Sequence, residues 1–465
     1  MTPRDHTQLL QALAQAYAQH APRSAALNRR AQQVMVDGGS HSLRLIHPFP
    51  PRLVEARGAC IRDADGHEIL DFWQGHHANI LGHNPPVVVE ALHQAFTTGQ
   101  GLLTGFTDEL QIEVAELLCR QTGAERVRFT TSGSLATMYA ILLARAFTGR
   151  ERVLKVGGGW HGAHPWGLVA VHMAPGSQPW GVESEGIPAA VVGEVVATCF
   201  NDPEALERDF REHGDRLACF IVEPFLGAGG FILATPEYLR TARALADRYG
   251  VVLIFDEVIS GFRFRAGDLG TLYGVRPDLA TFAKIIGGGL PVAAVAGRND
   301  IMRLCGREGG SRVAFSGGTY SALPAALLAA RAMLTYLVAH EAEIYPALGR
   351  LGAQMRRIMA EALAAEGLGP VRCTGEGNAV VAHSAFALPH FLARDDVALL
   401  RPEDVLDPGR CDVRLRDQAL HLALLLEDVH AVHGGGAVST AHTPADLARL
   451  DEACRRAARR IKPYL

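Results

Sequence analysis

The sequence predicts an α/β protein with a mainly parallel central sheet in a large domain, joined to a smaller α+β domain. Between about residues 125 and 300, short apolar runs alternate with helical patterns, which is typical of a parallel sheet covered by helices. The run Val251–Phe255 is continuous and ends in charged residues, as expected of a strand buried on both faces. At 465 residues the chain is too long for one small core, so a second domain is expected.

The composition is that of an ordinary soluble globular protein, with 48% apolar and 20% charged residues. A net charge of −4 gives no reason to expect binding to nucleic acid or to an anionic membrane. Eight cysteines without CxxC spacing indicate neither a zinc site nor a disulfide framework, so no metal is expected. There is no apolar run of membrane-spanning length and no signal-peptide core near the start, so a cytoplasmic location is expected.

The N-terminal part predicts two helices followed by a hairpin. Apolar residues at helical spacing predict an amphipathic helix over about 5–20, and a second helical pattern covers about 25–36. A loop rich in glycine and proline follows, and it contains Ser42 and Arg44. Asp-Ala-Asp-Gly then separates two short strand patterns, which predicts a hairpin between about 51 and 72.

A strand-to-helix turn at Thr130–Ser134 is a candidate phosphate site. The strand pattern 127–129 runs into Thr-Thr-Ser-Gly-Ser, and a long helical pattern begins immediately afterwards. Small hydroxyl residues and glycine at such a turn leave backbone N–H groups and a helix N-terminus free to bind phosphate. The alternative is an ordinary helix cap, since Ser and Thr are common at that position.

The next elements continue the alternation of strands and helices. The segment 173–192 is rich in Gly, Pro and Ser and predicts a long loop. A helix is expected over about 202–213, and a strand then ends at Glu223. A further helix spans about 236–249, with Thr235 as its N-cap before a proline.

Asp256 and Lys284 are the strongest candidates for chemistry. Asp256 ends the buried strand, and Lys284 is the only charged residue between Asp278 and Arg298. A lysine among apolar residues requires charge compensation or a lowered pKa, and an amine with a lowered pKa suits Schiff-base formation. A carboxylate at the strand end would keep a pyridinium nitrogen protonated, so the pair suggests pyridoxal 5′-phosphate (PLP). Each residue alone has an ordinary alternative, a surface lysine and a helix-capping or loop aspartate.

These motifs resemble those of the class III (subgroup II) aminotransferases. The segment FDEVISGFR…GVRPDLATFAKIIGGGLPVAAVAGR looks like the cofactor core of that family. It is most similar to the branch that contains glutamate-1-semialdehyde aminomutase, and the resemblance extends from about Arg30 to the C-terminus. It implies the PLP-dependent transferase fold type I, in which Lys284 holds the PLP aldehyde as an internal aldimine and Asp256 stabilises the protonated ring.

The resemblance also assigns residues around the cofactor. Ser132, Gly133 and Ser134 match the family's phosphate cup, although Leu135 stands where the family usually has Glu. Trp160 replaces the tyrosine that usually stacks on the pyridine ring; without the resemblance it would be an ordinary core residue. The implied cofactor-binding residues are Ser132, Gly133, Ser134, Trp160, His161, Glu223, Asp256, Val258, Lys284 and, from a partner subunit, Thr319.

Thr319 carries the prediction of a homodimer with shared active sites. Its segment is similar to the family's G-T-x-x-G-N-P, whose Thr reaches the phosphate of the neighbouring subunit. Ala322 and Leu323 replace the family's Gly-Asn, and a plain helix cap is the alternative for Thr319.

Ser42 and Arg44 are the candidate substrate-binding residues. A guanidinium group binds a carboxylate through two parallel hydrogen bonds, and a Ser followed by an Arg serves this purpose in the aminomutase branch. Arg44 lies two residues after Ser42 rather than the usual three, and a solvated loop arginine is the alternative.

The resemblance also implies a division into domains. Residues 1–74 would supply helices and a hairpin to the small domain, 75–328 would form the large PLP-binding domain, and 329–465 would form the C-terminal small domain. The polar, proline-containing insertion 390–413 is expected to be peripheral.

Two reactions compete within this class. We favour an aminotransferase, with a small-molecule amino donor and a keto acceptor; a 2,1-aminomutase, which moves the amino group within one molecule, is the alternative. Leu135, the shifted Arg44 and the lack of an acid between Val432 and Thr440, near which the aminomutase typically has a Glu, all argue against the aminomutase. A catalytically silent protein of this fold is a further alternative, but Lys284 is present.

Overall fold

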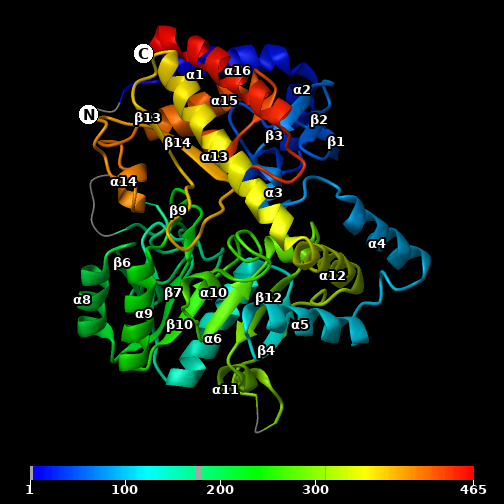
Figure 1. Cartoon of the computed structure of the whole chain (residues 1–465), viewed down its shortest axis with the longest axis vertical. Helices are drawn as coiled ribbons and strands as arrows, with labels where there is room; N and C mark the ends of the chain where they lie inside the picture. Colours follow the sequence, from blue (N-terminus) through cyan, green and yellow to red (C-terminus); the bar gives the residue numbers. More distant parts are fainter. Residues whose placement is uncertain (1–3, 173–179, 309–310) are drawn as a thin grey trace.

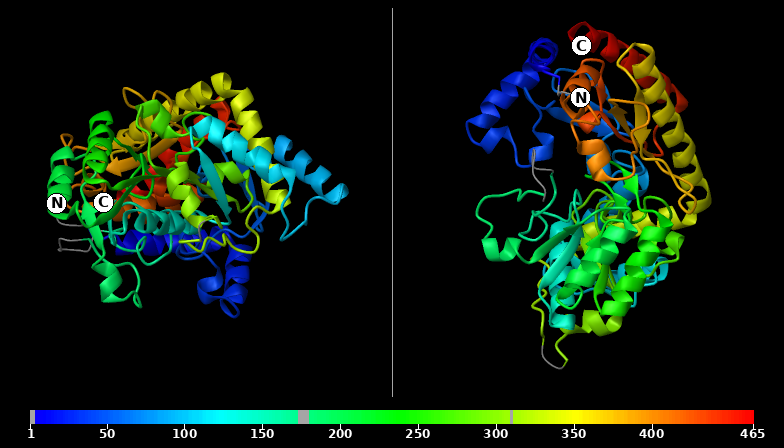
Figure 2. Two further views of the ribbon diagram at one scale, coloured as in Figure 1. Left: turned by 90° about the horizontal axis from the view of Figure 1, so that it is seen from below. Right: turned by 90° about the vertical axis from the view of Figure 1, so that its left-hand side faces the viewer.

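The computed structural model describes residues 4–172, 180–308 and 311–465 (Figure 1). A seven-stranded sheet and its helices form the lower part in Figure 1, and two small sheets with long helices form the upper part. Figure 2 shows the two parts one above the other in its right-hand view.

The order of the large sheet is β4-β12-β11-β10-β7-β5-β6. Its strands are β4 (Arg126–Thr130), β5 (Arg152–Val156), β6 (Val195–Thr198), β7 (Leu217–Val222), β10 (Val252–Asp256), β11 (Leu279–Phe282) and β12 (Ala293–Gly297). β10 pairs in parallel with β7 and β11, and β5 pairs in parallel with β6 and β7, whereas β12 is antiparallel to both neighbours. The prediction of a mainly parallel sheet is therefore confirmed.

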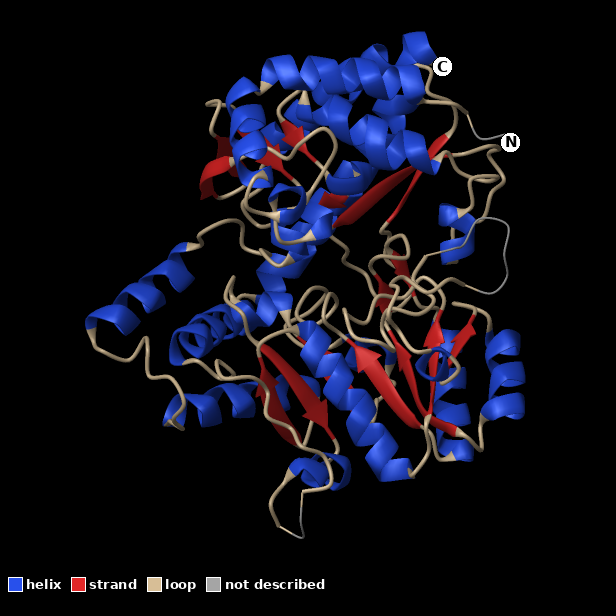
Figure 3. Cartoon of the chain, turned by 180° about the vertical axis from the view of Figure 1, so that it is seen from behind, coloured by secondary structure: helices blue, strands red, loops and turns tan. Residues whose placement is uncertain are grey.

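Helices cover both faces of this sheet. The helices of the lower part are α4 (Pro86–Thr97), α5 (Glu109–Thr122), α6 (Gly133–Thr148), α7 (Ala189–Val192), α8 (Pro203–His213), α9 (Pro236–Tyr249), α10 (Leu269–Tyr273), α11 (Asn299–Met302) and α12 (Pro324–Ala339). Alternate strand residues point to opposite faces, so Ile254 of β10 packs in the cluster of α6 while Leu253 and Phe255 pack in that of α9. Figure 3 shows a long helix across the face of the sheet that is turned away in Figure 1.

The upper part combines both ends of the chain. Its elements are α1 (Thr7–His20), α2 (Pro22–Gln32), β1 (Leu53–Arg57), β2 (Cys60–Asp63), β3 (Glu68–Asp71), α13 (Glu341–Ala365), β13 (Val371–Thr374), β14 (Phe386–Phe391), α15 (His421–Leu425), β15 (Val429–His430), β16 (Gly436–Ala437) and α16 (Pro444–Ile461). The predicted N-terminal helices and hairpin are present, and β15 from the C-terminal region extends the hairpin sheet beside β3.

The helix α12 bears on the division into domains. It packs against α4, α5 and the short turn η3 (Lys284–Gly287), all in the lower part. The expected boundary between 328 and 329 falls inside this helix. We therefore propose that the large domain extends to His340, after which α13 packs on α16 and on β13 and β14.

The insertion 390–413 is not simply peripheral, which corrects the expectation. It contains α14 (Pro402–Leu406), whose Val405 is fully buried. A Cβ atom on Gly230 would lie 2.5 Å from a Val405 methyl, and one on Gly158 would lie 2.7 Å from Pro402. The insertion therefore packs against the loop that follows β5 and against the turn between β8 (Phe225–Leu226) and β9 (Ile232–Leu233).

Other predictions about the lower part have mixed outcomes. Asp108 and Thr235 cap α5 and α9 through their side chains, the latter as predicted. Residues 173–179 of the expected loop lie outside the described residues, and the segment ends in α7.

The remaining elements are α3 (Gln74–His77), β8 (Phe225–Leu226), β9 (Ile232–Leu233) and short turns such as η2 (Ser42–Arg44). No helix of the described chain is long and apolar enough to cross a bilayer.

Candidate active site

Lys284 differs from the two other lysines of the chain, Lys155 and Lys462. Lys155 is buried and its amine donates to three backbone carbonyls, at 2.5, 2.9 and 3.4 Å, whereas Lys462 is exposed near the C-terminus. The Lys284 amine has no hydrogen bond or ion pair with any described residue. Burial lowers its pKa, against the opposing effect of the carboxylates of Asp256 and Glu223. Lys284 is therefore the one lysine placed as an available, less basic amine.

Asp256 is 3% exposed at the C-terminal end of β10. Its Oδ1 accepts hydrogen bonds from the Val258 backbone N–H and the Thr281 hydroxyl, both at 3.1 Å. Its Oδ2 accepts one from Nδ1 of His161 at 2.8 Å. These donors offset the cost of burying a carboxylate and fix its direction.

The turn at the start of α6 forms an anion-binding cradle. The Ser132 hydroxyl caps the helix by accepting from the Leu135 N–H, while the N–H groups of Gly133 and Ser134 have no acceptor among the described residues. A Cβ atom on Gly133 would lie 3.1 Å from both Val258 methyls, so only glycine fits without displacing Val258. The free N–H groups at the helix N-terminus suit the phosphate of PLP, and they lie beyond the same sheet edge as Asp256.

The loop after β5 holds Trp160 and His161. Glu223 fixes this loop, because its carboxylate accepts from the N–H of Trp160 at 2.9 Å and from the N–H of Gly227 at 3.1 Å. Burial raises the pKa of Glu223, and the negative charge of Asp256 adds to that rise. The Trp160 side chain is 39% exposed although its neighbours are buried, so its indole ring is available for stacking.

The short helix α3 lies against η3, which begins at Lys284. Arg44 is brought to α3, where its Nε donates to Nε2 of His76 at 3.1 Å. The rings of Trp73 and His41 pack on His76, with centroids 4.1 and 4.6 Å away. Ser42 is exposed in the same turn as Arg44. The structure thus brings Arg44 to an aromatic group beside the lysine segment.

Arg263 was not predicted from the sequence. It is 2% exposed, its guanidinium donates to the His77 carbonyl, and it lies 5.5 Å from the centre of the Phe386 ring. No carboxylate pairs with it among the described residues, and burial lowers its pKa to about 10. Its positive charge also acts on Lys284. Arg263 ends the segment FDEVISGFR that carries the family resemblance, but its partners His77 and Phe386 come from distant parts of the chain, so the segment alone did not indicate its role.

Thr281 and Lys155 were also missed. Thr281 faces Asp256 because the two are register partners on β11 and β10. Lys155 braces the loop after its own strand by binding the carbonyl of Gly159. The sequence contained a partial signal for Lys155, a charged residue within the apolar run Arg152–Val156.

Thr319 is exposed, as is the neighbouring Tyr320, at 61%. Thr319 has no hydrogen-bond partner among the described residues. The adjacent Gly318 faces Thr131, since a Cβ atom built on Gly318 would lie 3.5 Å from the Thr131 hydroxyl. The segment therefore lies beside the cradle of its own chain but leaves Thr319 open to solvent.

Comparisons with known proteins agree with this geometry. Residues 45–384 match the aminotransferase class-III family. The chain belongs to this family. It is 40% identical over 316 residues to a glutamate-1-semialdehyde 2,1-aminomutase of Methanocella arvoryzae, covering 68% of this chain and 72% of that protein.

Two solved structures extend the comparison. An omega-transaminase from Sphaerobacter thermophilus is 33% identical, with a TM-score of 0.85 over 94% of this chain and 98% of that one. A β-phenylalanine aminotransferase from Variovorax paradoxus is 30% identical, with a TM-score of 0.82 over 97% of each chain. The fold is therefore type I of the PLP-dependent transferases, and PLP is the cofactor of this class III enzyme.

Proposed function

We propose that this enzyme is an aminotransferase that moves an amino group between an amino acid or other amine and a keto acid or aldehyde. The observation that carries the proposal lies beside the lysine segment, where Arg44 donates to His76 and the rings of Trp73 and His41 pack on His76. One cation among aromatic rings fits a donor that has one carboxylate and an apolar or aromatic side chain.

The proposed chemistry begins at Lys284. When bound, PLP supplies an electron sink for the charge left when a bond at the substrate α-carbon breaks. Lys284 would be the point of covalent attachment, and its released Nζ would take the proton from the substrate α-carbon and deliver it to the carbon of the former aldehyde group, so that the amino group stays behind when the keto product leaves. Burial lowers the Lys284 pKa, which favours the neutral amine that this transfer requires.

The other proposed roles follow from position. Asp256, held by three donors, keeps the ring nitrogen protonated. The N–H groups of Gly133 and Ser134 and the Ser132 turn bind phosphate. Trp160 and Val258 would pack on the two faces of the ring when the cofactor is bound, and His161 and Glu223 hold Asp256 and the Trp160 loop.

We propose Arg44 as the carboxylate-binding residue, with Ser42 beside it. Because Arg44 is exposed and its guanidinium is bonded only to His76 among the described residues, it is free to exchange that neutral partner for a substrate carboxylate. Burial, together with the charges of His41, Arg44 and Lys284, lowers the pKa of His76 to about 3. A neutral His76 accepts from Arg44 without neutralising its charge.

We also propose a homodimer with shared active sites. Large apolar side chains are exposed along α4, the following loop and α5, and beside Thr319: Val89, Phe96, Leu102, Leu103, Phe106, Ile112 and Tyr320. The loop and the Thr319 segment are joined, because the Ala325 N–H donates to the Gly101 carbonyl. Such an apolar surface favours burial against a second copy, which would bring Thr319 to the phosphate cradle of the partner.

The decisive experiment is a half-reaction on purified holoenzyme. The visible absorbance of the cofactor is followed while aromatic α-amino acids, β-amino acids and simple amines are added singly, without an acceptor. Loss of that band with formation of an equal amount of keto product is expected for at least one donor. If no donor causes this change, the aminotransferase proposal fails.

The aminomutase is the second candidate, because the Methanocella arvoryzae relative with 40% identity has that name. It predicts that glutamate-1-semialdehyde is isomerised without a second substrate. The same preparation distinguishes the candidates: rapid isomerisation with no donor half-reaction supports the aminomutase, and the opposite result supports the aminotransferase.

A further inference from the structure

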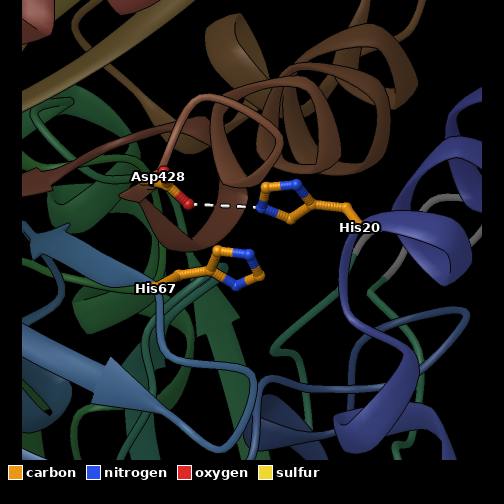
Figure 4. Close-up of side chains that lie close together, drawn as sticks. All are labelled: His20, His67 and Asp428. Atoms are coloured by element: carbon orange, nitrogen blue, oxygen red, sulfur yellow. Dashed lines mark hydrogen bonds and ion pairs between the residues drawn. The ribbon is translucent and has the colours of Figure 1, made fainter.

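Three side chains from separate segments of the chain gather in the upper part of the molecule (Figure 1 and Figure 4). His20 is the last residue of α1, His67 lies in the turn between β2 and β3, and Asp428 precedes β15. One ligand atom from each lies within 4.8 Å of those from the other two. Each side chain is about one-quarter to one-third exposed, so an ion from solvent can reach them.

The distances are close to those of a metal site. His20 Nε2 and Asp428 Oδ1 are 3.2 Å apart. Two ligands about 2.0–2.1 Å from a tetrahedral Zn²⁺ are separated by about 3.3 Å. The pair therefore already has the spacing of two ligands, and His67 must move inward to join them.

His67 also has the carboxylate partner that metal-binding histidines commonly have. Its Nδ1 donates to Oδ2 of Asp63 at 2.9 Å, which leaves Nε2 as the free, lone-pair-bearing nitrogen. In Figure 4 the His67 ring lies beside the His20–Asp428 pair. Asp63 is 2% exposed, and its other oxygen accepts from the His67 and Asp65 N–H groups, so the support is rigid.

Backbone contacts hold the three segments together before any ion binds. The Arg449 guanidinium donates to the carbonyls of both Glu68 and Asp428. The Asp65 carboxylate accepts from the N–H groups of Arg23 and Ser24, which attaches the start of α2 to the same turn. The backbone segments that carry the ligands are therefore held in place, which reduces the entropic cost of binding.

A second adjustment concerns His20. The His20 and His67 rings are stacked, with centroids 4.0 Å apart and planes at 8°. Two parallel rings cannot direct both lone pairs at one ion, so His20 must turn. Its place at the end of α1 and its partial exposure permit that rotation.

We propose that His20, His67 and Asp428 bind a divalent transition-metal ion of the Zn²⁺ class, with water as the fourth ligand. Two imidazoles and one carboxylate form a suitable ligand set for such an ion. The ion would link α1, the β2–β3 turn and the segment before β15, and so stabilise the N-terminal helix on the small domain. The site is independent of the proposed aminotransferase activity.

The test measures Zn²⁺ binding and melting temperature of metal-free holoenzyme, without amino acids present. We expect one Zn²⁺ per chain and a melting temperature that rises with the logarithm of free Zn²⁺, reversed by EDTA. His67→Ala and His20→Gln should abolish the rise. Asp63→Asn keeps a side-chain oxygen that can accept from the N–H groups of Asp65 and His67, but it removes the carboxylate charge beside the His67 ring. This variant should weaken Zn²⁺ binding by about 10- to 100-fold.

The matched control is His340→Ala, which removes an exposed histidine that has a carboxylate neighbour, Glu343, at 3.6 Å. It should bind Zn²⁺ as the wild type does. Unchanged cofactor absorbance and circular dichroism verify that each variant is folded. Absence of a rise in wild type, or an equal rise in all variants, overturns the proposal, since the ion would then not bind at these ligands.

Discussion

His161 Nδ1 lies 2.8 Å from Oδ2 of Asp256 and donates to it, although the two residues are 95 positions apart. Both side chains are buried, so this hydrogen bond forms away from competing water. It fixes the orientation of the carboxylate that we propose holds the ring nitrogen of PLP.

Replacing His161 should therefore weaken cofactor binding. Loss of a hydrogen bond to a charged group costs about 1.5–3 kcal/mol, so His161→Ala should raise the Kd for PLP by about 10- to 100-fold. His161→Asn, whose amide can donate from nearly the same position, is the matched control and should stay within a few-fold of wild type. Fluorescence titration of the apoenzyme with PLP measures both, and an unchanged Kd in the alanine variant would contradict the prediction.

The chain has only three lysines, which makes the attachment site testable without ambiguity. Borohydride reduction of the holoenzyme followed by peptide mass spectrometry should place the cofactor on Lys284 alone. Lys155 and Lys462 serve as internal controls, the first because its amine is fully engaged by carbonyls. Cofactor found on either control residue would refute the assignment.

A side chain at position 162 should weaken cofactor binding. Its φ is +97°, and a Cβ atom would lie 2.5 Å from the Ser134 Cα. Gly162→Ala should displace Ser134 and lower PLP affinity by about 10-fold, on top of about 1–3 kcal/mol of backbone strain.

Gly66 provides the control for that variant. It has the same φ of +97°, but its Cβ position is open. Gly66→Ala should lower the free energy of unfolding by a similar strain and leave the Kd for PLP unchanged. Equal PLP affinity in the two variants would show that the contact with Ser134 is unimportant.

Two buried histidines should make the protein less stable in acid. Burial lowers the pKa of His164 to about 4 and that of His442 to about 4. Between about pH 6.5 and 4 both are neutral when folded but bind protons when unfolded. Lowering the pH through this window therefore reduces the free energy of unfolding, by at most about 1.4 kcal/mol per pH unit for each histidine.

Urea unfolding at a series of pH values measures this dependence. His442→Asn retains an acceptor for the Ser439 N–H, which His442 Nδ1 accepts at 3.0 Å, and removes the titrating group. The stability of this variant should vary less steeply with pH. A slope equal to that of wild type would exclude His442 as a source.

The proposed shared site predicts complementation between subunits. Lys284→Ala homodimers should be inactive, and Thr319→Val homodimers should bind PLP about 10-fold more weakly through loss of one hydrogen bond to phosphate. In a dimer with one subunit of each variant, one site combines Lys284 of the Thr319→Val subunit with Thr319 of the Lys284→Ala subunit. Refolded mixtures should therefore regain one tight PLP site in each such dimer. If Thr319 acts within its own chain, mixing will restore no tight site.

The sequence predicted most of the local structure because its signals are local. The apolar run before Asp256, the Ser132 turn and the proline after Thr235 each specify an element through nearby residues, and each is observed. The end of the large domain was harder to place, since a continuous helix such as α12 gives no local signal of which core it packs on.

The candidate active site also combines features that local sequence signals predict with features that depend on distant contacts. By itself, the sequence determined the alternating fold, the family, PLP, and Asp256 and Lys284 as the candidate pair. Only the tertiary structure decided that Lys284 combines a lowered pKa with an amine that no described residue pairs, that Thr281 and His161 hold Asp256, and that no described carboxylate pairs with the buried Arg263. The reason is physical: hydrogen bonding and burial depend on which distant segments meet, and strand order and helix packing, rather than spacing along the chain, fix those meetings.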